Sequence, residues 1–166
     1  MDRTPLSPQE IADRLNLSPL SVEGGMFRRT WESKEQQNGN AMGSAIYFLL
    51  TANAFSHLHR LPSDEVYHFY LGDPVELSLL GPNGEVRQIT LGTDLLSGQV
   101  PQAVAPAGWW QGSRVMDGGE YALLGTTMAP GYVDEDYEHG NAAILKAQYP
   151  SAADIIDRLT GETVYL

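Results

Sequence analysis

Short runs of alternating apolar and polar residues occupy most of the chain. They are rich in aromatic and β-branched residues and bounded by Gly, Pro, Asn or Asp, which is typical of β-strands. The runs cover residues 26–33, 43–50, 54–59, 65–71, 75–80, 85–91, 100–105, 109–115 and 121–128. Residues 81–84, Gly-Pro-Asn-Gly, predict a hairpin turn because Asn-Gly tolerates positive φ. Many short strands with no helix between them predict an all-β fold, either a closed barrel or two packed antiparallel sheets.

A short helix is predicted at each end of the strand region. Ser7 and Glu10 have the spacing of a capping box, and Pro8 suits the first helical position. At the other end, Ser151 is expected to cap a helix that stops before Gly161.

Composition narrows the class of protein. The chain has 166 residues, 42% hydrophobic and 19% charged, which suits one globular domain over residues 1–166. Lys and Arg number 10 against 21 Asp and Glu, a net charge of −11, which argues against nucleic-acid and membrane-surface partners. The chain has no cysteine, which excludes disulfides and thiolate metal sites. Without a signal-peptide pattern or a long apolar stretch, we expect a soluble cytoplasmic protein.

Two histidines separated by one residue are the first candidates for a functional site. On a regular strand His57 and His59 project to the same face. Residues 61–63 break the strand, and Glu65 opens the next one, so pairing of the two strands would bring Glu65 beside the imidazoles. This set offers three ligands to a divalent transition metal. The alternative is a polar pocket in which these groups bind each other or a ligand.

Strand alternation predicts that aromatic side chains lie near this candidate pocket. Tyr67 and Phe69 share a strand face with Glu65, and Trp109 shares one with Gln111. Aromatic walls with a few placed polar groups are typical of a small-molecule site. The alternative is that these rings only fill the core, which is the stronger interpretation for Phe69.

A basic side chain follows a pair of glycines near the start of the chain. Arg28 comes shortly after Gly24 and Gly25, where a tight turn is expected. We consider it a candidate for binding a carboxylate or phosphate group. A surface ion pair or an interface contact is the alternative.

Two short motifs resemble those of the cupin superfamily. The first is a His-x-His pair, then a glutamate with five residues between, then a glycine with six residues between, at His57, His59, Glu65 and Gly72. The second is Pro-Ala-Gly-Trp-Trp-Gln at residues 106–111, with Gln111 where the family has its fourth metal ligand, a histidine. The resemblance implies a double-stranded β-helix (cupin jelly-roll) barrel with short terminal helices.

A longer resemblance points to one branch of that superfamily. It is carried by residues 23–28, 45–50, 59–60, 64–65, 68–70, 72–74, 101–102, 106–108, 110–111, 114 and 129–131. The branch consists of small dimeric jelly rolls without an assigned activity, and their barrel is similar to that of the dTDP-4-keto-6-deoxyhexose 3,5-epimerases. The resemblance therefore implies a homodimer. The chain differs from the branch at Ser21-Val22, where a His-Pro pair is common, and at His57, where the branch often has no histidine.

Three functions remain open at this point. The first is an epimerase-like or isomerase-like enzyme on a sugar-type or other polar metabolite, with His59 as base and Tyr67 or Glu65 as acid. The second is a metal-dependent oxygenase or isomerase that binds Fe, Mn, Ni or Zn through His57, His59 and Glu65, with Gln111 as a weaker ligand. The third is a ligand-binding or sensing module without catalysis.

Overall fold

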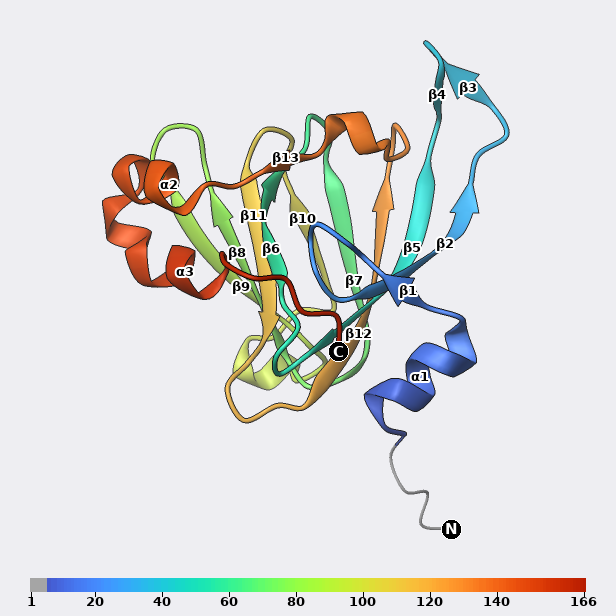
Figure 1. Cartoon of the computed structure of the whole chain (residues 1–166), viewed down its shortest axis with the longest axis horizontal. Coiled ribbons are helices and arrows are strands. Elements are labelled where there is room, and N and C mark those ends of the chain that lie inside the picture. The colour runs from blue at the N-terminus through green and yellow to red at the C-terminus, as the bar shows by residue number, and fades with distance from the viewer. Residues whose placement is uncertain (1–5) are drawn as a thin grey trace.

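The β-strands form two antiparallel sheets that face each other (Figure 1). The first sheet contains, in spatial order, β1 (Ser18–Pro19), β2 (Met26–Glu32), β5 (Ser44–Thr51), β12 (Tyr121–Met128), β7 (Glu65–Gly72) and β10 (Gln102–Ala105). The second contains β13 (Glu138–His139), β6 (Ser56–Arg60), β11 (Trp110–Val115), β8 (Val75–Leu80) and β9 (Val86–Leu91). A hairpin of β3 (Gln36–Gln37) and β4 (Asn40–Ala41) projects from the first sheet.

This computed structural model describes residues 6–166. The jelly-roll architecture predicted from the sequence is confirmed. Of the two arrangements that the sequence left open, the strands of residues 6–166 adopt the second, two packed antiparallel sheets rather than one continuous cylinder. The predicted strands are all present, and the turn at residues 81–84 joins β8 to β9, whose pairing starts at Leu80 and Val86.

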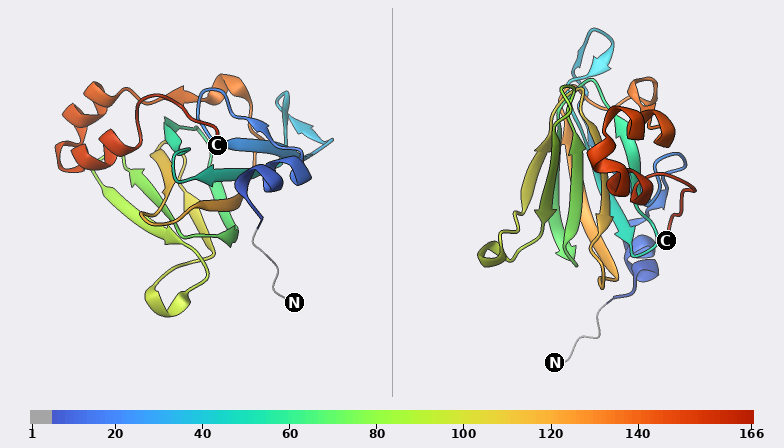
Figure 2. Two further views of the ribbon diagram at one scale, coloured as in Figure 1. Left: turned by 60° about the horizontal axis from the view of Figure 1, so that its bottom comes forward. Right: turned by 90° about the vertical axis from the view of Figure 1, so that its left-hand side faces the viewer.

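The helices lie outside the sheets. The capping box predicted for α1 (Pro8–Leu15) is confirmed. In Figures 1 and 2, α2 (Ala142–Gln148) and α3 (Ala153–Arg158) cover the outer face of the five-stranded sheet. No helix in residues 6–166 is long and apolar enough to cross a membrane.

Two details at the C-terminal end differ from the prediction. Ser151 lies inside a 3-10 turn (Pro150–Ala152) and makes no cap for α3. The helix α2 was not predicted. It is capped by Asn141, whose side chain accepts a hydrogen bond from the backbone N–H of Ile144.

The main core fills one end of the space between the sheets. Strands alternate their side chains, so β8 points Val75, Leu77 and Leu79 inward, and β12 points Ala122 and Leu124 toward them. Each fully buried Leu contributes about 1.5–3 kcal/mol through the hydrophobic effect. Aliphatic side chains therefore fill this end of the space between the sheets. Buried polar side chains of the strands lie at the opposite end.

Candidate active site

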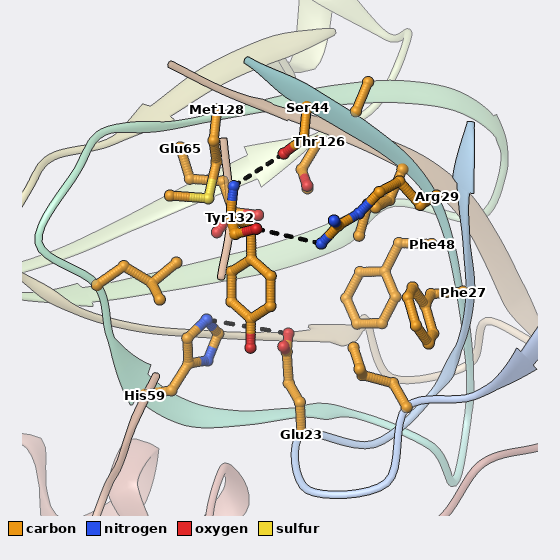
Figure 3. Close-up of a pocket in the computed structure, with 14 residues that line it drawn as sticks. Glu23, Phe27, Arg29, Ser44, Phe48, His59, Glu65, Thr126, Met128 and Tyr132 are labelled. Carbon is orange, nitrogen blue, oxygen red and sulfur yellow. Dashed lines mark hydrogen bonds and ion pairs between the residues drawn. The ribbon is translucent and has the colours of Figure 1, made fainter. Parts of the chain in front are cut away.

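A cavity opens at the end of the fold where β5 and β7 begin and β12 ends (Figure 3). Met128, the last residue of β12, pairs with Ser44 on one side and with Glu65 on the other, so three neighbouring strands meet here. The cavity contains about 530 Å³ of space free of protein atoms, counted together with the part that opens to solvent. Its acidic and imidazole groups are Glu23, His59 and Glu65.

A β-bulge in β6 decides which of its side chains reach the cavity. Along β11, Gln111 pairs with His59 and Ser113 pairs with Ser56, so three steps on β6 match two on β11. Side chains three residues apart point to opposite faces of a regular strand. Here the Oγ of Ser56 donates a hydrogen bond to the Oε1 of Glu23 at 2.6 Å, and the Nε2 of His59 lies 4.0 Å from the same oxygen. The extra residue of the bulge brings both groups to one side.

The bulge also corrects the prediction for His57. Its side chain does not line the cavity, and its ring stacks on that of His139 with 3.8 Å between centroids. Burial lowers the pKa of His57, and the charged groups that act on it are His139 and His59 rather than Glu65. The prediction assumed unbroken alternation from residue 57 to residue 59, which the bulge interrupts.

His59 presents a hydrogen-bond acceptor to the cavity. Its Nδ1 lies 2.8 Å from the carbonyl oxygen of His57 and therefore carries the proton and donates it. The lone pair of the neutral ring is then on Nε2, which faces Glu23. Burial lowers the pKa of His59, and the charge of Glu65 acts in the opposite direction. The ring is also held by stacking on Tyr137, with centroids 5.1 Å apart.

Glu23 reaches the cavity from the turn between β1 and β2. It precedes Gly24 and Gly25, whose φ angles of 99° and 72° lie in the left-handed region that favours glycine. The carbonyl of Glu23 accepts a hydrogen bond of 2.8 Å from the N–H of His57 in β6. The N–H of Gly25 donates to the carbonyl of Val164 at 2.9 Å, so the C-terminal tail holds this turn in place.

The carboxyl group of Glu23 ionises near neutral pH. Burial raises the pKa of Glu23 to about 7, although the hydroxyl of Ser56 acts against this. The neighbouring His59 does not remove the cost of burying this charge, because its own ring is neutral. Near pH 7 the protonated and the ionised form of Glu23 are therefore both populated.

Glu65 also lines the cavity, next to Glu23 and His59. Burial and the charge of Glu23 raise the pKa of Glu65, while His59 and the side chains of Thr126 and Gln111 lower it. Gln111 is bound from its other side by Tyr67, whose hydroxyl donates to Oε1 at 2.7 Å.

Tyr67 is therefore not placed as the sequence predicted. Burial and the nearby Glu65 raise its pKa well above the usual value, so its hydroxyl stays protonated. That proton is engaged with Gln111, and Tyr67 is not one of the residues that line the cavity. Tyr67 supports the site from behind rather than acting as its acid.

A long segment, residues 130–140, crosses the open end of the fold (Figure 1). The N–H of Tyr132 donates to the Oγ of Ser44 at 2.9 Å, and Arg60 binds the carboxylate of Glu138 through two nitrogens at 2.9 Å each. Figure 3 shows the ring of Tyr132 extending across the cavity. Burial raises the pKa of Tyr132, so this phenol is protonated at neutral pH.

The other predicted ligand-binding residues lie elsewhere. Arg28 donates from Nε to the carbonyl of Leu15 at 2.7 Å, outside the cavity. Phe69 belongs to the core, which agrees with the stronger of its two interpretations. Trp109 precedes β11, so strand alternation does not direct it inward, and the guanidinium of Arg87 lies 4.5 Å above its ring.

Sequence reasoning missed several groups of the site. Glu23 precedes two glycines, and such a pair indicates that the backbone passes close to another segment. The sequence therefore marked this turn, but we selected the nearby Arg28 as its candidate binding residue. The cavity is instead lined by Arg29. Ser56 and Tyr132 come from a bulge and from an irregular segment, and neither follows a periodic pattern.

Comparison with known proteins decides the family. A family model described as the cupin superfamily (DUF985) matches residues 9–140. The chain belongs to this cupin family. Protein SO0799 from Shewanella oneidensis has a solved structure that is 31% identical with a TM-score of 0.89, and the match covers 95% of this chain and 99% of that one. The uncharacterized protein YML079W from Saccharomyces cerevisiae is 25% identical over 133 residues, 69% of this chain and 66% of the yeast protein, slightly less than two thirds of its length.

Some cupins use a metal, and the donor set here does not fit one. Oxalate decarboxylase from Bacillus subtilis shares the fold with a TM-score of 0.56 at 14% identity over 90% of this chain and 38% of that one, and it has Mn(II) centres. In residues 6–166 of this cupin, no three His, Asp or Glu side chains are grouped to hold a metal ion. His57 stacks outside the cavity, and the amide oxygen of Gln111 is bonded to Tyr67. The set predicted from His57, His59, Glu65 and Gln111 is thus not assembled.

Proposed function

We propose that this cupin is an enzyme that transfers a proton next to a carbonyl group of a small polar metabolite, as epimerases and isomerases do. One observation carries the proposal. The free Nε2 of a neutral imidazole, His59, lies 4.0 Å from the carboxyl group of Glu23, whose pKa is about 7, at the inner end of a largely apolar cavity. General acid–base catalysis requires an unprotonated base beside a protonated acid, and the pKa of the acid here lies near neutral pH.

The two groups have complementary tasks in this chemistry. His59 takes a proton from the carbon beside the carbonyl, so the C–H bond breaks and the electron pair moves toward the carbonyl oxygen. Protonated Glu23 donates a hydrogen bond to that oxygen as negative charge develops on it. Glu65 stabilises the imidazolium, because its negative charge raises the pKa of His59. Return of the proton from His59 to the neighbouring carbon gives an isomer. Delivery of a solvent proton to the other face of the first carbon, while His59 releases its proton to solvent, gives an epimer.

A deuterium-exchange assay tests this proposal and does not require the product to be identified. The protein is incubated in D₂O with a panel of neutral and phosphorylated ketoses and aldoses, and loss of the α-proton signal is followed by NMR. We expect catalysed exchange with at least one sugar-type compound. Binding by these compounds without exchange would instead support a ligand-binding module and overturn the enzymatic proposal.

Replacing Glu23 with glutamine is expected to change the pH dependence of exchange. In the wild type, kcat/KM falls above about pH 7 as Glu23 loses its proton. The amide of Glu23→Gln still donates a hydrogen bond but does not ionise, so the alkaline decline disappears and the activity near pH 6 falls by only about 10- to 100-fold. A decline above pH 7 that persists in the variant would assign it to another group.

The same variant reports on this ionisation without any substrate. The folded-state pKa of about 7 exceeds the usual 4.5, so the folded chain keeps a proton that the unfolded chain has released. The free energy of unfolding therefore falls as the pH rises from 4.5 to 7, by about 3 kcal/mol in total. Relative to wild type, Glu23→Gln should gain thermal stability between pH 5 and pH 8, whereas the exposed control Glu35→Gln should not. A gain independent of pH would contradict the assignment.

We further propose that the protein works as a cytoplasmic homodimer. The outer face of the six-stranded sheet carries Tyr70 and Val104, which are 49% and 46% exposed, and Tyr70 packs edge-on against Tyr47. Exposed apolar side chains gathered on a sheet face are typical of an interface. Light scattering is expected to give twice the chain mass, with Tyr70→Glu monomeric and the control Leu96→Glu, on the distant turn Leu95–Ser97, still dimeric. A wild type that is monomeric at micromolar concentration would overturn the dimer.

A further inference from the structure

The charges around the cavity are distributed unevenly. Its inner end contains the buried carboxyl group of Glu65 and that of Glu23, whose side chain is 15% exposed, beside the neutral ring of His59. Among the lining residues in the described part of the chain, Arg29 is the one permanent cation. Within that part, the inner end therefore offers no positive group to pair with an anion on a ligand.

Arg29 does not correct this imbalance, because it lies at the rim and is already engaged. Its side chain is 37% exposed and forms an ion pair with Glu32. Its Nη2 also donates to the backbone carbonyl of Tyr132 at 3.2 Å. In Figure 3 Arg29 lies at the backbone end of Tyr132, whereas His59 and Glu23 lie at its phenol end.

The remaining walls are mostly apolar. Phe27, Ile46 and Phe48 of the first sheet contribute to the lining, and Leu20, Leu61 and Met128 add further apolar surface. A ligand that fills the cavity must bury surface against these side chains, and a phosphate or carboxylate at its inner end would lose its hydration without gaining a positively charged partner.

We infer that the substrate is an uncharged hydroxy-carbonyl compound with an apolar flank, such as a deoxy sugar in its keto form, and that it carries no phosphate or carboxylate near the reacting carbon. This inference rests on the proposed function for the nature of the reacting group. The charge selection rests on Glu65, on the ionised form of Glu23 and on the lack of a cation at the inner end among the described lining residues. A unit negative charge placed near Glu65 in a partly buried site meets a repulsion large enough to weaken binding by at least about tenfold.

The test compares matched probes that differ in charge. A 6-deoxyketohexose, the parent ketohexose and the ketohexose 6-phosphate are each titrated at millimolar concentration, and binding is measured by ligand-observed NMR. We expect the deoxy sugar to bind best and the phosphate at least about tenfold more weakly than the parent sugar. Equal or tighter binding of the phosphate, or no binding of either neutral sugar, would overturn the inference.

Two variants separate this cause from a general effect of net charge. Glu65→Gln, close to isosteric, should narrow the preference for the neutral sugar over its phosphate by at least about fivefold. Glu35→Gln removes the same charge from an exposed position next to β3 and should leave the preference unchanged. Equal changes in both variants would attribute the preference to the overall charge of −11 and overturn the inference. Because α-proton exchange is measured separately, selective binding without exchange would reject the catalytic proposal and leave the charge selection intact.

Discussion

Replacing His59 with glutamine is expected to lower the rate of α-proton exchange by about 10²- to 10⁴-fold, the range over which a general base contributes. The free Nε2 of this ring is the acceptor that faces Glu23 in the cavity. Glutamine fills a similar volume but has no basic nitrogen, so the first proton transfer loses its base. The measurement is the NMR exchange assay at pH 6.5, on a sugar that the wild type turns over.

His68 offers a matched control for this substitution. It lies on the opposite face of β7 from Glu65 and contacts the hydroxyl of Thr127 with its Nε2 at 3.1 Å. His68→Gln should therefore exchange at the wild-type rate. A His59→Gln protein that retains its melting temperature and still exchanges at the rate of the His68 variant would remove His59 from the mechanism.

Replacing Gly24 with alanine is expected to lower the free energy of unfolding by about 2–4 kcal/mol, a large value for a single methyl group. The φ angle at this position is 99°, and a Cβ atom would lie 2.5 Å from the backbone oxygen of Phe55 and 3.3 Å from that of Val164. Both neighbours are main-chain atoms of segments that are held in place, so neither can give way cheaply.

A second glycine serves as a control that distinguishes the cost of backbone strain from the cost of a steric clash. Gly39 in the β3–β4 hairpin has a φ of 85°, and a Cβ atom added there would meet no other atom within 4 Å, so Gly39→Ala should cost only about 1 kcal/mol. Urea denaturation of both variants gives the comparison. Similar losses in the two variants would mean that the contacts with Phe55 and Val164 do not constrain the turn that carries Glu23.

The strands and the class of fold were predictable because they depend on local pattern. β8 and β9 alternate apolar and polar residues around an Asn-Gly turn, and such a pattern specifies both strand and hairpin. α2 escaped prediction because it has only seven residues, too few for a clear helical period. The short strand β13 depends on pairing with β6 across more than seventy residues of sequence.

The site was predicted less completely than the fold, for a related reason. His59 and Glu65 do line one cavity, as strand alternation indicated. Glu23 joins them through contacts with β6 and with the C-terminal tail, which no local pattern encodes. His57 was placed wrongly because a bulge is a property of the pairing of two strands and leaves no mark in the sequence of one.

The bulge in β6 also gives this strand an unusual tolerance to a change in length. If His57 were removed, Ser56 and His59 would stand two positions apart and still face Glu23, while Leu58 between them would still pack beneath α2 and α3. The shorter strand would match β11 residue for residue. A chain one residue shorter at this point can therefore keep His59 and Ser56 facing Glu23, and with them the geometry of the candidate site.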